Sequence, residues 1–232
     1  GAPDPNLTSA AATVTVTVNG PPTHFVLATG AATAACGNLS NPCTLAQALT
    51  NIGAAVNRQI FIADAATHTA TVVLNAGESL TGQGVTGVDF ASVLGYTTAI
   101  GALPVGASFA ALPAINQARP TVTSAGTSVT LSTNNTLRGL NLTSTGGTTL
   151  SGTSFGTLTA SAISITGGLP ALNLNTGTAA ATFDSLTATG GATGVNVNAL
   201  AGNLTINGGA VSGSTSTAFA VTGGTANITY AG

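Results

Sequence analysis

A repeat of roughly 21 to 24 residues in the second half of the chain limits its fold more than any other feature. Short segments of Thr, Asn and aliphatic residues recur between Gly-Gly or Ser-Gly corners. Two columns of apolar residues follow this period: Leu137, Leu158, Ala181, Leu204 and Ile228 in one, and Leu150, Leu172, Val195 and Phe219 in the other. A unit this short buries its apolar edge only by stacking on its neighbours, so the period predicts a solenoid.

From residue 119 onward, each repeat is expected to hold about three short strands separated by corners. The expected fold class is all-β, a parallel β-helix with about 22 residues per coil. Inward aliphatic residues would stack on like residues one coil away, and outward Thr, Ser and Asn would form polar ladders. The last repeat is cut short at Ile228 and Tyr230.

Composition restricts the partners of this chain. The formal net charge is -2, only 3% of residues are charged, and Arg58, Arg119 and Arg138 are the only basic residues besides histidine. Nucleic acid is therefore not an expected partner, because no basic surface exists for phosphates. Polar residues interrupt every apolar run before it reaches the roughly 20 residues that span a bilayer, so membrane insertion is not expected.

The N-terminal region predicts one extended strand. Val14, Val16 and Val18 alternate with threonines before Gly20-Pro21-Pro22 ends the pattern, and residues 1–22 are assigned to this strand and its linker. A lone strand needs a partner. Three partners are open: an upstream immunoglobulin-like module, the solenoid of the same chain, or a neighbouring subunit.

Cys36 and Cys43 enclose Gly, Asn and Pro residues that favour a turn, and this predicts a disulfide. A zinc site is the weaker alternative, because no second pair of ligands accompanies them. A disulfide indicates an oxidising, extracellular location. The numbering begins at Gly1 with no visible leader, so we expect either a removed signal peptide or a piece of a longer chain.

Residues 44–56 are the one good helix candidate, with apolar residues at helical spacing, and Gln59-Ile60-Phe61-Ile62 follows as a strand. The segment 41–49, Asn-Pro-Cys-Thr-Leu-Ala-Gln-Ala-Leu, together with 60–63 resembles the N-terminal part of right-handed parallel β-helices of the pectin-lyase-like superfamily. Residues 80–84 and 135–142 are similar to coil sequences of that superfamily.

The resemblance covers roughly residues 36–232. It implies a right-handed parallel β-helix, assigned here to residues 23–232, whose N-terminal end is closed by the helix at 44–56. Enzymes of that superfamily use clusters of acidic residues on one face, in some cases with calcium and a basic residue.

Residues 85–118 break the period and contain Phe90, Tyr96 and Phe109. One interpretation is an insertion that leaves a corner of the solenoid and makes contacts through these aromatic residues. The other is an irregular coil whose aromatic residues fill the core.

Acidic residues are too few and too scattered to predict catalysis: Asp4, Asp64, Glu78, Asp89 and Asp184. No pair suits glycoside hydrolysis and no cluster suits calcium. Asp64 and His68, with Glu78 nearby, are interpreted as a solvated corner rather than an acid-base pair, and His24 as a surface or packing residue. No cofactor, no metal and no enzymatic activity are expected.

These observations predict an extracellular structural protein of a bacterial surface that associates with itself head to tail into a filament or sheath. In this hypothesis the strand with Val14, Val16 and Val18 is added to the open C-terminal end, at Ile228 and Tyr230, of the next subunit. The other explanation of the open end is that the chain was cut from a longer protein or continues beyond residue 232. The alternative function is the β-helical stalk of a large surface adhesin whose residues 85–118 bind a host, a surface or a glycan, and a polysaccharide lyase or hydrolase comes third.

Overall fold

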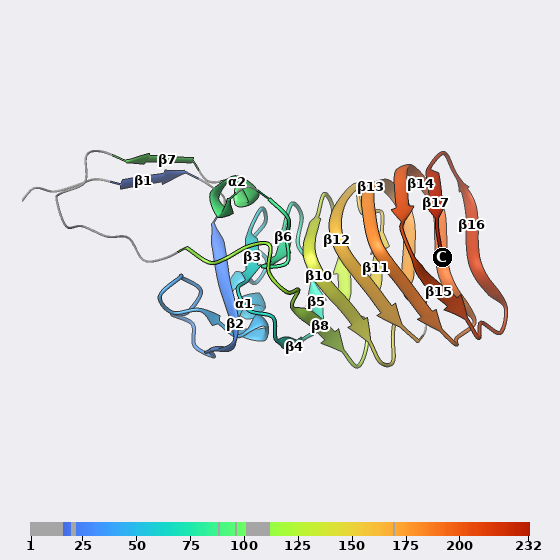
Figure 1. Ribbon diagram of the computed structural model, residues 1–232, viewed down its shortest axis with the longest axis horizontal. Coiled ribbons are helices and arrows are strands. Elements are labelled where there is room, and N and C mark those ends of the chain that lie inside the picture. Colours follow the sequence, from blue (N-terminus) through green and yellow to red (C-terminus); the bar gives the residue numbers. More distant parts are fainter. Residues whose placement is uncertain (1–15, 20–21, 88, 96, 101–111, 169) are drawn as a thin grey trace, which may run out of the picture.

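The structure, a computed structural model, describes residues 16–19, 22–87, 89–95, 97–100, 112–168 and 170–232. They form an elongated parallel β-solenoid of about seven turns, with about 23 residues in each turn. Figure 1 shows the coils stacked along the long axis, with the N-terminal elements at one end and the C-terminal strands at the other. The predicted all-β fold class and the coil length are confirmed.

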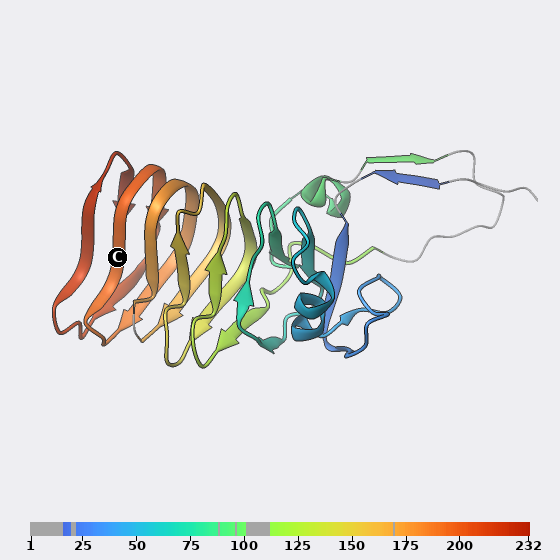
Figure 2. The same ribbon diagram turned by 180° about the vertical axis from the view of Figure 1, so that it is seen from behind.

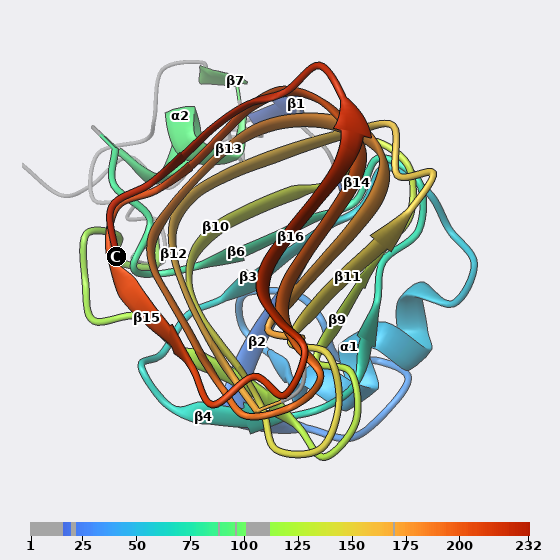
Figure 3. The same cartoon turned by 90° about the vertical axis from the view of Figure 1, so that its right-hand side faces the viewer.

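Each coil contributes a strand, or part of a longer strand, to three parallel faces, which Figure 3 shows down the long axis. Face 1 contains β2 (Thr23–Ala31), β3 (Gln59–Ile62), β6 (Ser79–Gly82), the first parts of β10 (Thr136–Ser144) and β12 (Thr157–Gly167), the middle of β13 (Leu172–Thr189), the end of β14 (Thr193–Ile206), and β17 (Asn227–Tyr230). Face 2 contains β4 (Thr67–Thr69), β8 (Thr121–Ser124), the last parts of β10, β12 and β13, and β15 (Gly209–Ser212). Face 3 contains β5 (Val72–Val73), β9 (Val129–Leu131), β11 (Leu150–Thr153), the first parts of β13 and β14, and β16 (Thr217–Gly224).

The interior is built from stacked aliphatic ladders, because alternate residues of a strand point to opposite sides. On face 3, Leu150 pairs with Leu172, Leu172 with Val195, and Val195 with Phe219, which confirms the predicted second column. The first three of these residues are fully buried. Stacking like residues on like in this way removes apolar surface from water at every coil.

The predicted first column needs one correction. Leu137 pairs with Ala160, and not with Leu158, whose partner is Ala179. Both Leu158 and Ala160 lie on the inward side of β12 and are buried. Moving the pairing register of a strand by two residues leaves every side chain on the same side of the sheet. The alternation of apolar and polar residues therefore does not distinguish the two registers. The rest of that column, from Ala181 through Leu204 to Ile228, is correct.

The N-terminal end of the solenoid is closed by a helix and a disulfide-linked loop. Helix α1 (Leu45–Ile52) confirms the predicted helix, although it ends earlier than residue 56 because Gly53 adopts a positive φ of 56° and its N–H bonds to Leu49 O. The Thr44 side chain caps its first turn by accepting from Gln47 N. The buried residues of α1, which form its inner side, are Leu45, Ala48 and Ile52.

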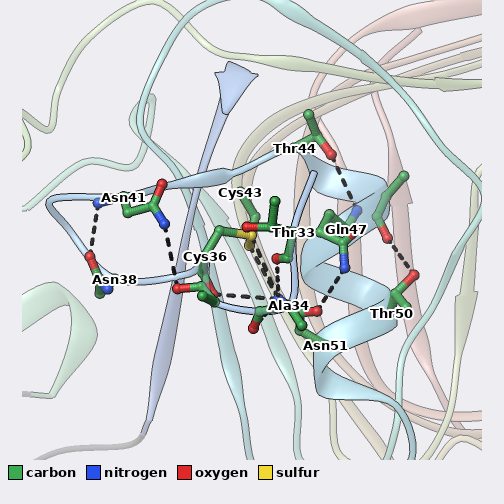
Figure 4. Close-up of a disulfide and its surroundings, with 12 residues drawn as sticks. Thr33, Ala34, Cys36, Asn38, Asn41, Cys43, Thr44, Gln47, Thr50 and Asn51 are labelled. Carbon is green, nitrogen blue, oxygen red and sulfur yellow. Dashed lines mark hydrogen bonds between the residues drawn. A yellow bond between two sulfur atoms is a disulfide. The ribbon is translucent and has the colours of Figure 1, made fainter. Parts of the chain in front are cut away.

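The loop before α1 covers the free edge of β2. Phe25 N donates to Gly37 O at 2.9 Å, and Ala31 N donates to Pro42 O at 2.8 Å. The predicted disulfide between Cys36 and Cys43 is present, with Cα atoms 5.1 Å apart. Figure 4 shows it beside α1, and both cysteines are buried. The first coil therefore has no exposed sheet edge along this stretch of β2.

Residues 85–118 contain helix α2 (Phe90–Leu94) and strand β7 (Thr97–Ile100) among their described part. Phe90 packs against Phe61 and Phe25 on the outer side of face 1, in a small apolar cluster separate from the interior of the solenoid. Helix α2 thus covers the outside of the first coils (Figure 2). Neither interpretation from the sequence describes Phe90: it lies outside the core of the solenoid, and at 6% exposure it is not available for contacts.

Candidate functional site

The last coil of the solenoid, formed by β15, β16 and β17, is paired on one side only. β15 pairs with β13, and both β16 and β17 pair with β14. Within the described residues, no strand pairs with the opposite edges of these three strands. Their backbone N–H and C=O groups on that side point into solvent, which is the usual condition for pairing with a further strand.

Apolar side chains lie above the core at this end. Ile228 pairs with Leu204, and Tyr230 pairs with Ile206. The two β14 residues are fully buried, whereas Ile228 and Tyr230 are half-buried, because they have a coil below them and none of the described residues stacked above. The rings of Tyr230 and Phe219 lie 5.6 Å apart, and Val221 is 54% exposed. We name the exposed side of β15, β16 and β17 the open end.

The predicted N-terminal strand is present in part, as β1 (Val16–Asn19). It pairs antiparallel with β7, with Val16 opposite Ile100 and Val18 opposite Thr98. Val14 lies outside the described residues. Its partner β7 belongs to the segment 85–118 of the same chain and not to one of the three solenoid faces, and pairing with an upstream module or a neighbouring subunit stays a prediction.

The ribbon of β1 and β7 lies beyond α2, at the opposite end of the molecule from β16 and β17 (Figures 1 and 2). Within the described part of the chain, β7 is the only strand that pairs with β1, so the second edge of β1 has no strand beside it. The part of the chain that the structure describes therefore presents a strand edge at each end.

Of the three residues predicted to form a contact loop, the structure tests only Phe90. Phe90 is buried against Phe61, and Tyr96 and Phe109 lie outside the described residues. Instead, α2 and the outer side of face 1 form the walls of a groove of about 360 Å³. Its polar lining includes Gln59, Ser79, Thr81, Thr136 and Arg138. Arg138 reaches toward α2, where it donates a hydrogen bond to Val93 O.

Asp64 and His68 form a pair that the sequence interpretation placed in solvent, and this placement was wrong. His68 Nε2 lies 2.7 Å from Asp64 Oδ1, and the His68 side chain is only 2% exposed. The ring occupies an inward position of β4, where His68 pairs with Val122. Glu78 does not join them: it is fully buried and accepts hydrogen bonds from the backbone and side chain of Asn75.

Hydrogen bonds set the charge state of Asp64. Partial burial alone raises the pKa of this carboxyl group, but the bonds from Ala28 N, His68 and Ala66 N outweigh burial and hold the pKa below its usual value of 3.8. The Ala28 N bond is 2.6 Å long and comes from β2, so the carboxylate links two coils. We assign this pair to the stability of the capped end.

Asp184 and Arg119 form an ion pair that sequence analysis missed. Arg119 also donates to Ser164 Oγ at 3.2 Å. The two charges are 65 residues apart in the chain, and no local pattern marks them as neighbours. Both are partly exposed, so the pair contributes little to stability.

No group of three or more metal-ligating side chains is found among the described residues. None of the helices in the described ranges is long and apolar enough to cross a membrane. His24, interpreted as a surface or packing residue, is partly buried and pairs with Ile60 on face 1.

The fold class of this chain rests on its structure, and comparison with known proteins gives no relative. The parallel β-solenoid agrees with the resemblance to parallel β-helices at the level of architecture. Searches with family models, curated proteins and solved structures found no match to this chain. Membership of the pectin-lyase-like superfamily stays a prediction, and function rests on the geometry of the chain itself.

Proposed function

We propose that this chain is an extracellular structural protein that assembles head to tail, with the N-terminal strand of one copy completing the open end of the next. The observation that carries the proposal is the difference between the two ends. One end is closed by α1 and the loop of the disulfide, whereas the other presents three strand edges around partly exposed apolar side chains.

The spacing of residues on the two strands supports this contact. Ile228 and Tyr230 are two residues apart on β17, and Val16 and Val18 are two residues apart on β1. Both strands have four residues. Because β1 pairs with β7 along one edge only, its second edge can add to β17 without separating the ribbon.

Contact between unlike ends has a geometric consequence. A strand edge at one end and an open coil at the other form a heterologous interface, which repeats without closing on itself. Full burial of an exposed aliphatic side chain contributes about 1.5–3 kcal/mol, and Val221, which is 54% exposed before contact, contributes part of that value at the junction. Backbone hydrogen bonds along the new strand pair add directionality.

An extracellular location is part of the proposal. The Cys36–Cys43 disulfide is typical of oxidising compartments. Only 3% of residues are charged, and a formal net charge of -2 gives little repulsion between copies. The proposal involves no catalytic step, cofactor or metal.

Electron microscopy and light scattering of the purified chain test the assembly. We expect fibres from the wild-type chain and monomers after deletion of residues 1–20. Val221→Asp should also prevent assembly by placing a charge at the open end. The matched control is Val73→Asp, because Val73 is 59% exposed on the side of the solenoid, far from the open end.

Two outcomes would contradict the proposal. The first is a wild-type chain that stays monomeric at high concentration. The second is equal fibre formation by Val221→Asp and Val73→Asp, which would separate assembly from the open end. A longer natural chain whose own residues cover this coil would also overturn the proposal.

The polar groove beneath α2 supports a second proposal, a stalk of a surface adhesin that binds a neutral glycan. Amide and hydroxyl groups from Gln59, Ser79 and Thr136 line it, and Arg138 is the only charged residue of its lining. A glycan array tests this function. We expect binding that Arg138→Ala weakens, and an array without signal would sink the adhesin proposal.

A further inference from the structure

Face 2 carries a column of five threonines on its outer side, one from each of five consecutive coils. The register pairs Thr69 with Thr123, Thr123 with Thr143, Thr143 with Thr166, and Thr166 with Thr187. A second column runs beside it, two residues earlier in each strand, and consists of Thr67, Thr121, Asn141, Ser164 and Ser185. We name these ten residues the threonine face.

The five threonines of this column lie on the outward side of their strands, where Thr69 and Thr166 are exposed and the other three are half-buried. Within the described residues, none of these five side chains makes a hydrogen bond to another protein group. Face 3 behaves differently, because Asn196 Nδ2 donates to Asn173 Oδ1 and Asn198 Nδ2 donates to Asn175 Oδ1, each at 2.9 Å. These asparagines of face 3 thus bond to one another, whereas the five threonines of face 2 leave their hydroxyl groups available to partners outside the described residues.

The positions of these hydroxyl groups repeat in two dimensions. Neighbouring coils are about 4.8 Å apart, and alternate residues of one strand are about 6.6 Å apart. The strand register aligns the rows from coil to coil, and Figure 3 shows the coils lying over one another in the view down the long axis. Threonine is branched at Cβ, which restricts χ1 and limits the orientations that its methyl and hydroxyl groups can adopt.

The chemistry of this face selects among partners. None of its ten residues is charged or aromatic, and the charged groups beside it lie at its corners: Asp64 before Thr67, and the Arg119–Asp184 pair beside Ser164. A protein partner is recognised mainly through aromatic residues, Met and Arg at the centre of an interface. Nucleic acid would need basic residues. A rigid, neutral lattice of hydroxyl and methyl groups instead suits a partner that is itself a lattice of water.

We propose that the threonine face binds ice. The ordered hydroxyl groups hold a first layer of water at fixed spacing, and this layer joins the surface of an ice crystal while the methyl groups fill the space between. Because the solenoid holds the side chains in place before binding, little conformational entropy is lost on contact. The inference goes beyond the proposed assembly and does not depend on it.

Thermal hysteresis and ice recrystallisation measurements on the intact chain test the inference, with growing ice crystals in dilute buffer as the probe. We expect the wild-type chain to adsorb to ice and slow its growth. Thr143→Tyr and Thr166→Tyr, at the centre of the column, should each lower the activity at equal concentration by about tenfold, as central contacts carry most of an interface. The control is Thr205→Tyr, at an outward threonine of face 1 that pairs with Thr182 and Thr229.

Thermal unfolding followed by circular dichroism accompanies each variant, so that a loss of activity with an unchanged melting curve supports the inference. Absence of any effect of the wild-type chain on ice growth overturns it. Equal losses from Thr205→Tyr and Thr143→Tyr overturn it too. Retention on crystalline cellulose or chitin that Thr143→Tyr abolishes, without any effect on ice, would assign the face to a polysaccharide lattice instead and equally overturn it.

Discussion

Asp64 accepts a 2.7 Å hydrogen bond from His68 although the histidine ring lies on the inward side of β4. The same carboxylate accepts from Ala28 N on β2 and from Ala66 N at its own corner. One ionised side chain therefore connects the first strand of face 1 with the first strand of face 2. The capped end depends on its charge.

Acid should destabilise the capped end by protonating Asp64. The pKa of Asp64 is lower in the folded chain than its ordinary value of 3.8, so the ionised form stabilises the fold above pH 3.8. This contribution is lost as pH falls below 3.8 through the folded-state pKa. Urea unfolding between pH 6 and pH 2 measures the loss, and Asp64→Asn should flatten the curve in that range. An equally steep curve for Asp64→Asn would contradict the assignment.

His24 should produce a separate change at higher pH. Burial lowers its pKa, and the charge of Arg58 lowers it further, so the folded chain favours the neutral ring. The unfolded state then binds more protons than the folded state just below pH 6.5, and stability falls as pH decreases through this range. We expect His24→Gln to remove this phase and to leave the Asp64 phase unchanged, as read from urea midpoints at pH 8, 6.5 and 5.

Reduction of the disulfide should destabilise the chain by about 2–3 kcal/mol, the value that loop closure predicts for so short a loop. Cys36 and Cys43 are seven residues apart, and Asn51 Nδ2 lies 3.4 Å from Cys36 O. The Cys36→Ser, Cys43→Ser double variant should match the reduced wild-type chain in urea. A variant as stable as the oxidised wild-type chain would show that the loop needs no covalent link.

Gly139 should tolerate no side chain. Its φ is +67°, and an added Cβ would lie against the backbone of Gly84 and Val85. Gly139→Ala is expected to lower the free energy of unfolding by more than about 2 kcal/mol, because backbone strain and overlap add. Gly95, with φ of +73° and open space around it, is the matched control. Gly95→Ala should cost only about 1–2 kcal/mol, from backbone strain alone. Similar losses in both variants would show that overlap with Gly84 and Val85 adds nothing at Gly139.

Adjacent residues of β13 should differ sharply in their contribution to stability. Leu172 is fully buried in the face 3 ladder, and Leu172→Ala is expected to cost about 2–5 kcal/mol. Asn173 points outward and accepts one bond from Asn196, so Asn173→Ala should cost about 0.5–1.5 kcal/mol. Thermal and urea unfolding of both variants checks the difference. Equal costs would contradict the inward and outward assignment of the strand.

Local pattern was sufficient for much of the fold. The period of the repeat predicted the solenoid, and the column from Leu150 to Phe219 was correct at every position. Capping residues and helical spacing predicted α1, and turn residues predicted the disulfide. The displaced pairing at Leu158 shows where this reasoning fails. Two inward positions that lie two residues apart on a strand both fit the alternating pattern, so the pattern cannot tell which of them pairs with Leu137.

The architecture follows from local sequence, because stacking of short apolar units is a nearest-neighbour property that repeats along the chain. Which distant residues meet was visible only in the folded chain. The fold paired β1 with β7, placed Phe90 outside the core, brought Arg119 to Asp184 and aligned the threonines of face 2. Such contacts depend on the register and corner lengths of every coil between the partners, which no local pattern of residues specifies.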